Sequence, residues 1–235
     1  MKYEAVLIFF LFFLSNINCI AQETTINTDR PDQSDGVSVV PVGKFQIEEG
    51  ITLAKETTLS DLALRYGITR STEVRLIFEV GKELIKEGLK PVTLGMKQKI
   101  IEQYGIFPSI TFVGYLSYDQ LATKDFQDDE WSFQTKLAFE NELSDRFSLG
   151  YNVGTANKFE NLDLSLNLGC AATPKVTAFI EYFSTIDRIN SEHNVDMGVL
   201  YLITPLFQAD VALGHSIFAN DDRFFTSFGL SYLFN

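Results

Sequence analysis

The sequence is short of the residues that build disulfides, metal centres and most active sites. Its 235 residues include two cysteines, Cys19 and Cys170, and two histidines, His193 and His215. Cys19 lies in a segment that we expect to be removed, so the mature chain keeps one thiol and forms no internal disulfide. No metal-ligand spacing, phosphate loop or nucleotide fingerprint occurs. We therefore predict no metal and no cofactor.

Basic residues are also scarce. The 19 lysines and arginines face 31 aspartates and glutamates, which gives a formal net charge of −12. Nucleic-acid-binding surfaces need clustered lysine and arginine, so this balance argues against a nucleic-acid partner. Hydrophobic residues make up 46% of the chain, and this excludes a disordered protein.

Long apolar runs are missing beyond the N-terminus. Residues 1–21 read as a cleaved secretory signal peptide, with Lys2 as a weak positive start, an apolar run over 5–14 and small residues at 19–21. That run is shorter than the roughly 20 residues that a membrane-spanning helix needs. In the alternative reading, a lipoprotein signal with the lipid on Cys19, residues 16–18 are not the small residues that such a site prefers. The rest of the chain predicts no transmembrane helix.

What the sequence does have is alternation of apolar and polar residues. From residue 44 onward this alternation repeats over segments of roughly 8 to 12 residues, which is the signal of β-strands. In the last segment Phe224, Phe228 and Phe234 share one face, while Ser227 and Ser231 lie on the other. About 12 such segments occur, an even number as in bacterial outer-membrane barrels. We predict an all-β chain, a transmembrane antiparallel up-and-down β-barrel over residues 44–235.

A soluble β-sandwich or lipocalin-like barrel would show the same periodicity with the apolar face turned inward. Three features favour the membrane barrel. The apolar face is continuous over nearly every segment, the opposite face mixes both charge signs with glycines, and aromatic residues gather near segment ends. Outer-membrane lipid is therefore an expected partner.

The connections between segments differ in length. Short ones fall at 69–72, 143–146, 172–175 and 204–206, and longer ones at 81–88, 117–131, 155–161, 184–194 and 216–223. In outer-membrane barrels the short turns face the periplasm. We therefore expect both termini in the periplasm and the longer, acidic loops outside the cell.

The polar face of the predicted strands carries charges that would point into the lumen. These candidates are Glu48, Asp61, Arg65, Arg75, Glu79, Lys97, Lys99, Lys136, Glu140, Asp163, Glu181, Asp196 and Asp210. They either line a path for small polar or amphipathic solutes or pair with one another and close a narrow lumen. Inward glycines, such as Gly67, Gly214 and Gly229, would leave room or relieve strand curvature.

An acidic leader, residues 22–43, separates the signal from the barrel. Pro31 and Pro41 make it a poor central strand. One reading is a plug that enters the lumen from the periplasm, with Asp29, Arg30 and Asp32 as its candidate residues and with both aspartates meeting Arg65 and Arg75. The other is a solvated leader outside the barrel.

Two stretches carry a family resemblance. The sequence TDRPDQSD at 28–35, followed by VPVGKFQIE at 40–48, resembles the opening of the outer-membrane proteins grouped as the phenol-degradation meta-pathway (MetA-type) transporter family; LRYGIT at 64–69 and EVRL at 73–76 resemble its next two strands. The resemblance implies an outer-membrane barrel that transports small solutes, including hydrophobic or aromatic ones, and has no catalytic residues. Outer-membrane barrels usually end on an aromatic residue read by the barrel assembly machinery, whereas here Asn235 follows Phe234.

Three functions remain open at this stage. The first is a channel or transporter for small solutes, and the second is a structural or surface-binding barrel without transport. The third is a lipid-modifying enzyme, which needs a nucleophile and a base within hydrogen-bond reach. His215 and Ser216 would point to opposite faces of one strand, and His193 lies in a predicted loop, so we assign no catalytic residue.

Overall fold

The computed structural model describes residues 24–127, 131–156, 159–188, 191–218 and 223–234. The expected signal peptide, 1–21, lies outside the described residues. The described chain forms the strands β1 Phe45–Ala54, β2 Thr57–Gly67, β3 Thr72–Glu83, β4 Lys86–Leu89, β5 Val92–Ile101, β6 Ser109–Tyr118, β7 Trp131–Glu142, β8 Phe147–Ala156, β9 Asn161–Thr173, β10 Val176–Ile186, β11 Ser191–Thr204, β12 Phe207–Ile217 and β13 Phe224–Phe234. Two 3-10 turns, η1 Asp119–Leu121 and η2 Lys124–Phe126, follow β6.

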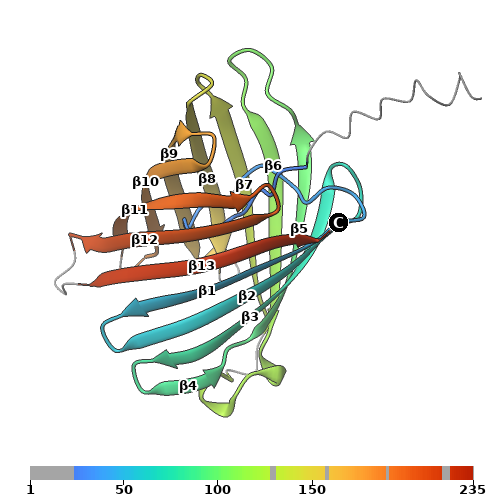
Figure 1. The fold of residues 1–235 in the computed structure, drawn as a ribbon. Coiled ribbons are helices and arrows are strands. Elements are labelled where there is room, and N and C mark those ends of the chain that lie inside the picture. The colour runs from blue at the N-terminus through green and yellow to red at the C-terminus, as the bar shows by residue number, and fades with distance from the viewer. Residues whose placement is uncertain (1–23, 128–130, 157–158, 189–190, 219–222, 235) are drawn as a thin grey trace, which may run out of the picture.

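Neighbouring strands pair antiparallel around a closed sheet (Figure 1). The first and last strands close it, with β1 paired to β13 from Phe45 opposite Phe234 to Ala54 opposite Phe225. Strands β4 and β5 both pair with β3, so they are two segments of one barrel strand that is interrupted at Pro91. Proline has no N–H to donate to the ladder, which accounts for a break at this position. The barrel therefore has 12 strands, and the predicted fold class is confirmed.

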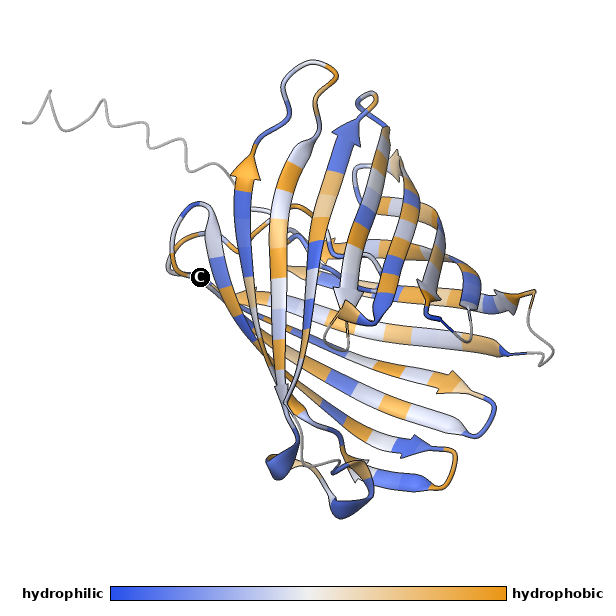
Figure 2. Ribbon diagram, turned by 180° about the vertical axis from the view of Figure 1, so that it is seen from behind, coloured by the Kyte–Doolittle hydropathy of each residue, from blue (hydrophilic) through white to orange (hydrophobic). Residues whose placement is uncertain are grey.

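Hydrophobic and hydrophilic residues alternate along many of the strands (Figure 2), and the exposed side chains are mainly apolar whereas the buried ones are mainly polar. On β13, Phe224, Phe228 and Phe234 are exposed, whereas Ser227 and Ser231 are buried. The largest fully buried side chains are mostly charged or polar and include Arg65, Lys97, Gln46, Glu73 and Glu181. A water-soluble protein would bury its apolar face, so this distribution fits a wall that faces lipid.

The connections lie at the two ends of the barrel, and some of their lengths differ from those that the sequence predicts. Residues 81–88 are not a long loop: β3 runs to Glu83, β4 begins at Lys86, and a tight turn at Leu84 and Ile85 joins them. Strand pairing there needs only backbone groups, so it continues through charged residues that break the apolar pattern. Conversely, 102–108 is a longer connection at the otherwise short-turn end. The predicted 184–194 loop is shorter, because β10 runs to Ile186 and β11 begins at Ser191, so His193 lies in a strand and not in a loop.

Both ends of the barrel sheet, the start of β1 and the finish of β13, lie at the short-turn end (Figure 1). Helices play little part: no helix among the described residues has the length and apolar character needed to cross a bilayer.

A charge placed on the apolar outside tests which solvent this face meets. Met197, in the middle of β11, is 57% exposed and points outward. We expect Met197→Arg to lower the unfolding free energy in lipid vesicles by roughly 2–4 kcal/mol, because arginine is costly at the bilayer midplane. Denaturant unfolding of vesicle-inserted protein measures this. Ile203→Arg, near the strand end, is the control and should cost less; equal small effects at both positions would contradict a lipid-facing wall.

Candidate functional site

The leader lies inside the barrel. It enters from the short-turn end, where the backbone N–H of Ile26 donates to the carbonyl of Pro205 at 2.8 Å, and it returns to that end at Val42, which bridges Gly67 of β2 (Figure 1). Between these points its residues bond to side chains from β1, β2, β3, β6, β8, β9, β10 and β12. The segment therefore crosses the lumen and contacts the wall on most of its circumference.

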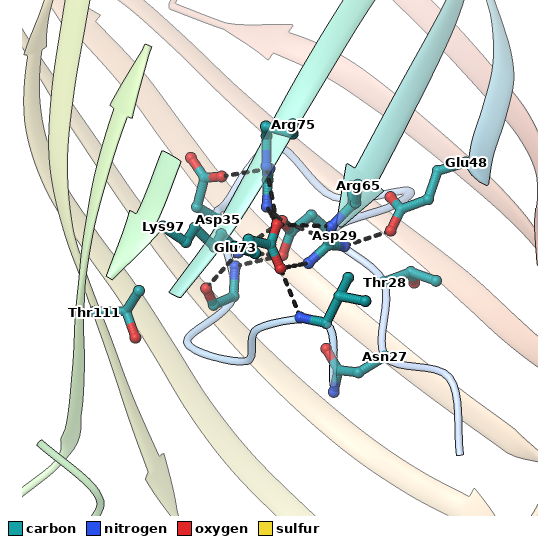
Figure 3. Close-up of polar contacts among 12 residues, drawn as sticks. Asn27, Thr28, Asp29, Asp35, Glu48, Arg65, Glu73, Arg75, Lys97 and Thr111 are labelled. Atoms are coloured by element: carbon teal, nitrogen blue, oxygen red, sulfur yellow. Dashed lines mark hydrogen bonds and ion pairs between the residues drawn. The ribbon is translucent and has the colours of Figure 1, made fainter. Parts of the chain in front are cut away.

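Asp29 is the centre of a buried ion cluster (Figure 3). Its carboxylate oxygens lie 2.6 and 2.7 Å from Nζ of Lys97, 2.7 Å from Nη2 of Arg75 and 3.6 Å from Nη1 of Arg65. Burial alone would raise the pKa of Asp29, but the charges of Lys97, Arg65 and Arg75 together hold this pKa well below its usual value. Asp29 is therefore an anion at neutral pH.

Glu73 and Glu48 complete the cluster from the wall. Arg65 and Arg75 stand directly opposite each other on β2 and β3, a like-charge pairing that would be destabilising alone. Glu73 lies between them, accepting from Nε and Nη2 of Arg65 at 2.9 Å and from Arg75, while Glu48 accepts from Arg65. The Glu73 side chain is fully buried, and its carboxylate bridges the two arginines.

Asp35 is likewise held by basic side chains, further round the barrel wall. It lies 3.1 Å from Nζ of Lys136 and 3.5 Å from Arg75, and it accepts the hydroxyl of Tyr115. Its backbone N–H and carbonyl form two hydrogen bonds with the Asn152 amide, at 2.7 and 3.0 Å. Burial raises the pKa of Asp35, but Lys136 and Lys97 outweigh this, so the net shift is downward. The leader's two ionised carboxylates thus lie on the basic side of the lumen.

Arg30 occupies a slot that two glycines leave open. Gly50 of β1 and Gly229 of β13 are paired across the closing seam, and a Cβ atom would approach the Arg30 guanidinium within 2.0 Å at Gly50 and 2.4 Å at Gly229. Asp61 accepts two hydrogen bonds from Arg30, at 2.7 and 2.9 Å. Ser227 accepts another at 2.8 Å. Asp210 lies 3.6 Å away. The sequence predicts open space beside the inward-facing Gly229, and the Arg30 side chain of the leader fills that space.

Asp32 faces the acidic side, and here one prediction is wrong. Asp32 does not meet Arg65 or Arg75; it accepts a hydrogen bond from Asn167 at 2.7 Å. Burial, followed by the charges of Glu181, Asp29 and Asp196, raises the pKa of Asp32 well above its usual value. Its neighbours in the leader bind Glu181 with uncharged donors, the backbone N–H of Gln33 at 2.7 Å and the Ser34 hydroxyl. The leader turns between Asp29 and Asp32, so the Asp32 carboxyl faces a different side of the barrel wall from Asp29.

The remaining lumen candidates all lie on the inward face but away from the leader's ion cluster. Lys99 pairs with Glu102 at 2.8 Å, Glu79 lies 3.5 Å from Lys90, and Asp163 accepts from Gln134 and Thr185, both at 2.9 Å. Glu140 shares this face, opposite Ser109. Asp196 is 2% exposed. His215 and Ser216 point to opposite faces, as the strand register requires.

Several residues that contact the leader are not among the candidates that the sequence indicates, including Glu73, Tyr115, Asn152 and Asn167. Glu73 stands two residues before Arg75 on the same face, so period-two counting from Arg75 would have found it. Tyr115, Asn152 and Asn167 carry no charge, and a search for charges alone passes over them. Their roles depend on where the leader runs, which strand periodicity does not indicate.

A cavity of about 750 Å³ lies on the other side of the leader, toward the long-loop end. Leader residues 29–35 form its floor. Its wall includes residues near the strand ends, among them Thr52, Leu59, Thr93, Ser117 and Phe225. The leader thus lies between this cavity and the short-turn end of the lumen. Among the described residues, no group of three or more histidines, cysteines and acids could hold a metal ion.

The chain matches one protein family and is similar in fold to several solved structures. A family model described as "Putative MetA-pathway of phenol degradation" matches residues 28–234. No curated protein matches the chain. Among solved structures, the COG4313 outer membrane channel from Pseudomonas putida F1 is similar with a TM-score of 0.67 and 11% identity, over 87% of this chain and 100% of that one. The KdgM porin in complex with disordered oligogalacturonate gives 0.64 and 9%, over 81% and 99%. The NanC porin gives 0.60 and 7%, over 80% and 98%. At such identities these likenesses concern the fold.

Neutralising Asp29 tests the ion cluster. We expect Asp29→Asn to weaken docking of the leader by roughly 3–5 kcal/mol, because it leaves three buried cations short of one partner. Hydrogen exchange of residues 24–43, followed by mass spectrometry, would show faster exchange there and little change in the strands. Asp145→Asn, in an exposed turn, is the matched control. Unchanged leader protection in Asp29→Asn would contradict the proposed anchoring.

The raised pKa of Asp32 gives docking a pH dependence. As pH rises above the usual aspartate value, the undocked leader loses its Asp32 proton while the docked leader keeps it, so docking weakens until the raised pKa is passed. Leader protection factors, which are corrected for the pH dependence of intrinsic amide exchange, should therefore fall by about threefold or more as pH rises above about 4. Asp32→Asn should flatten this slope. If Asp32→Asn leaves the pH dependence of leader protection unchanged, another titratable group causes that dependence.

Proposed function

We propose that this chain, which belongs to the family described as "Putative MetA-pathway of phenol degradation", is an outer-membrane channel for small solutes whose lumen is closed by its own leader. One observation carries the proposal. A 12-strand barrel with a polar interior encloses a segment of its own chain, which lies between a cavity and the short-turn end. In the outer membrane, the short turns and both termini would face the periplasm and the cavity would face outward.

The way the leader is held supports a closure that can be reversed. Most of its contacts are ion pairs and hydrogen bonds, which water can replace when the segment moves. Its buried apolar contacts are few: Ile26 and Val40 pack with Leu233, and Val37 packs with Val113 and Ala138. A segment meant only to fill the barrel permanently would bury more apolar surface.

The solute class in this proposal comes from the family description. Small hydrophobic or aromatic compounds are the solutes that a role in phenol degradation would require. Insertion into the outer membrane would involve the barrel assembly machinery and outer-membrane lipid as partners, as for other barrels of this type. No catalytic residue enters the proposal.

Electrical conductance in planar bilayers tests the proposal. The full chain should show rare or small openings, and the Asp29→Asn/Arg30→Ala variant should open more often, at least about tenfold, because a loss of 1.4 kcal/mol in docking is already tenfold in population. Asp145→Asn is the control for a lost surface charge. A folded variant with a released leader and no conductance would instead favour a structural or surface-binding barrel.

A further inference from the structure

The cavity above the leader, which we call the vestibule, has a marked imbalance of charge. Two basic side chains, Arg30 and Arg75, line it. The acids that line it are Asp29, Asp32, Asp35, Glu48, Asp61 and Glu79. Lys97, Lys136 and Arg65, which lie behind this lining, pair with Asp29, Asp35 and Glu48, and the pKa of Asp32 is raised. The negative potential that a solute meets therefore comes from the partly exposed Asp61 and Glu79, and it favours cations over anions.

Both vestibule arginines already have acidic partners. Arg30 donates to both carboxylate oxygens of Asp61 and to Ser227. Arg75 binds Asp29 at 2.7 Å and also binds Glu73. An anionic solute that entered would have to displace one of these carboxylates before it found a cation. Glu79, which lies 3.5 Å from Lys90, and Asp61, which binds Arg30, still keep 37% and 30% of their side-chain surface exposed.

One part of the vestibule wall is aromatic. Phe183 of β10 and Phe225 of β13 turn their rings inward, in an edge-to-face arrangement with centroids 6.3 Å apart. Gly214 of β12 makes this possible, because a Cβ there would lie 2.0 Å from the Phe225 ring. These rings come from β10 and β13, whereas Asp61 and Glu79 come from β2 and β3. A ring-bearing solute could therefore pack on the phenylalanines while its polar group faces carboxylates.

We propose that the vestibule binds small solutes in which a positive charge is joined to an apolar ring, such as protonated aromatic amines, and discriminates against the corresponding carboxylates. The cavity volume of about 750 Å³ is in the range of small-molecule sites and leaves room for water around such a solute. This inference rests on the proposed channel function and names the charge class of its solutes.

Equilibrium dialysis with three probes of similar shape tests the inference. The full chain in detergent micelles is dialysed against benzylammonium, benzyl alcohol and benzoate, and binding to protein-free micelles is subtracted. We expect benzylammonium to bind at least about tenfold more tightly than benzoate, a difference of 1.4 kcal/mol, with benzyl alcohol between them. Equal or tighter binding of benzoate, or no protein-dependent binding of any probe, would overturn the inference.

Two pairs of variants locate the site. Glu79→Gln should reduce the preference for benzylammonium over benzoate by about threefold, by lowering the local negative potential; Glu102→Gln, the same change at the short-turn end, should leave it unaltered. Phe225→Ala should weaken benzylammonium and benzyl alcohol together, whereas Phe228→Ala, on the outward face of the same strand, should weaken neither. Far-UV circular dichroism confirms that each variant is folded. If Phe225→Ala has no effect on binding, the vestibule is not the site.

The dialysis result and the conductance result are independent of each other. A barrel that conducts when its leader is released, yet shows no preference among the probes, would retain the channel function and lose the solute class. A barrel that binds benzylammonium at Phe225 and never conducts would retain the site and lose the channel.

Discussion

The ion cluster around Asp29 is the interaction on which the interior of this barrel depends. The wall buries Arg65, Arg75 and Lys97 close together and supplies Glu48 and Glu73 to pair with the two arginines. Burying ions is costly unless each is paired and hydrogen-bonded. Without the leader this group holds one more positive than negative charge, and Asp29 supplies the difference. The leader is therefore part of the charge balance of the barrel wall.

The two sides of the lumen impose opposite demands on one short segment. On the basic side the leader presents ionised Asp29 and Asp35, and on the acidic side it presents uncharged donors from Gln33 and Ser34 to Glu181. Asp32 belongs to the acidic side, where burial and the neighbouring acids raise its pKa. The same separation of charge continues into the vestibule. Its two arginines, Arg30 and Arg75, are paired with carboxylates when the leader is docked, whereas Asp61 and Glu79 stay partly exposed. In the channel that we propose, closure of the lumen and charge selection above it would both follow from this one distribution of charge.

Much of the fold follows from local pattern. Period-two alternation identified every strand of the barrel wall, its apolar outside and the inward face of Gly214 and Gly229, because each strand must place alternate side chains in lipid and in the lumen. The pattern failed where that constraint ends. Strand β3 and segment β4 extend beyond the alternating region through Lys82, Glu83 and Lys86, where backbone pairing continues without an apolar face.

The sequence by itself indicated a barrel of about 12 strands and which residues face its lumen, and it offered a plug in which Asp29 meets Arg65 and Arg75 as one of two readings of the leader. Only the tertiary structure decided that Asp32 lies against Asn167, that Arg30 lies on Gly50 and Gly229, and that Glu73 joins the basic side chains. The reason is physical. The direction of a strand side chain is fixed by its neighbours along the chain, whereas the path of an irregular segment is fixed by hydrogen bonds and charges contributed from strands far apart in sequence.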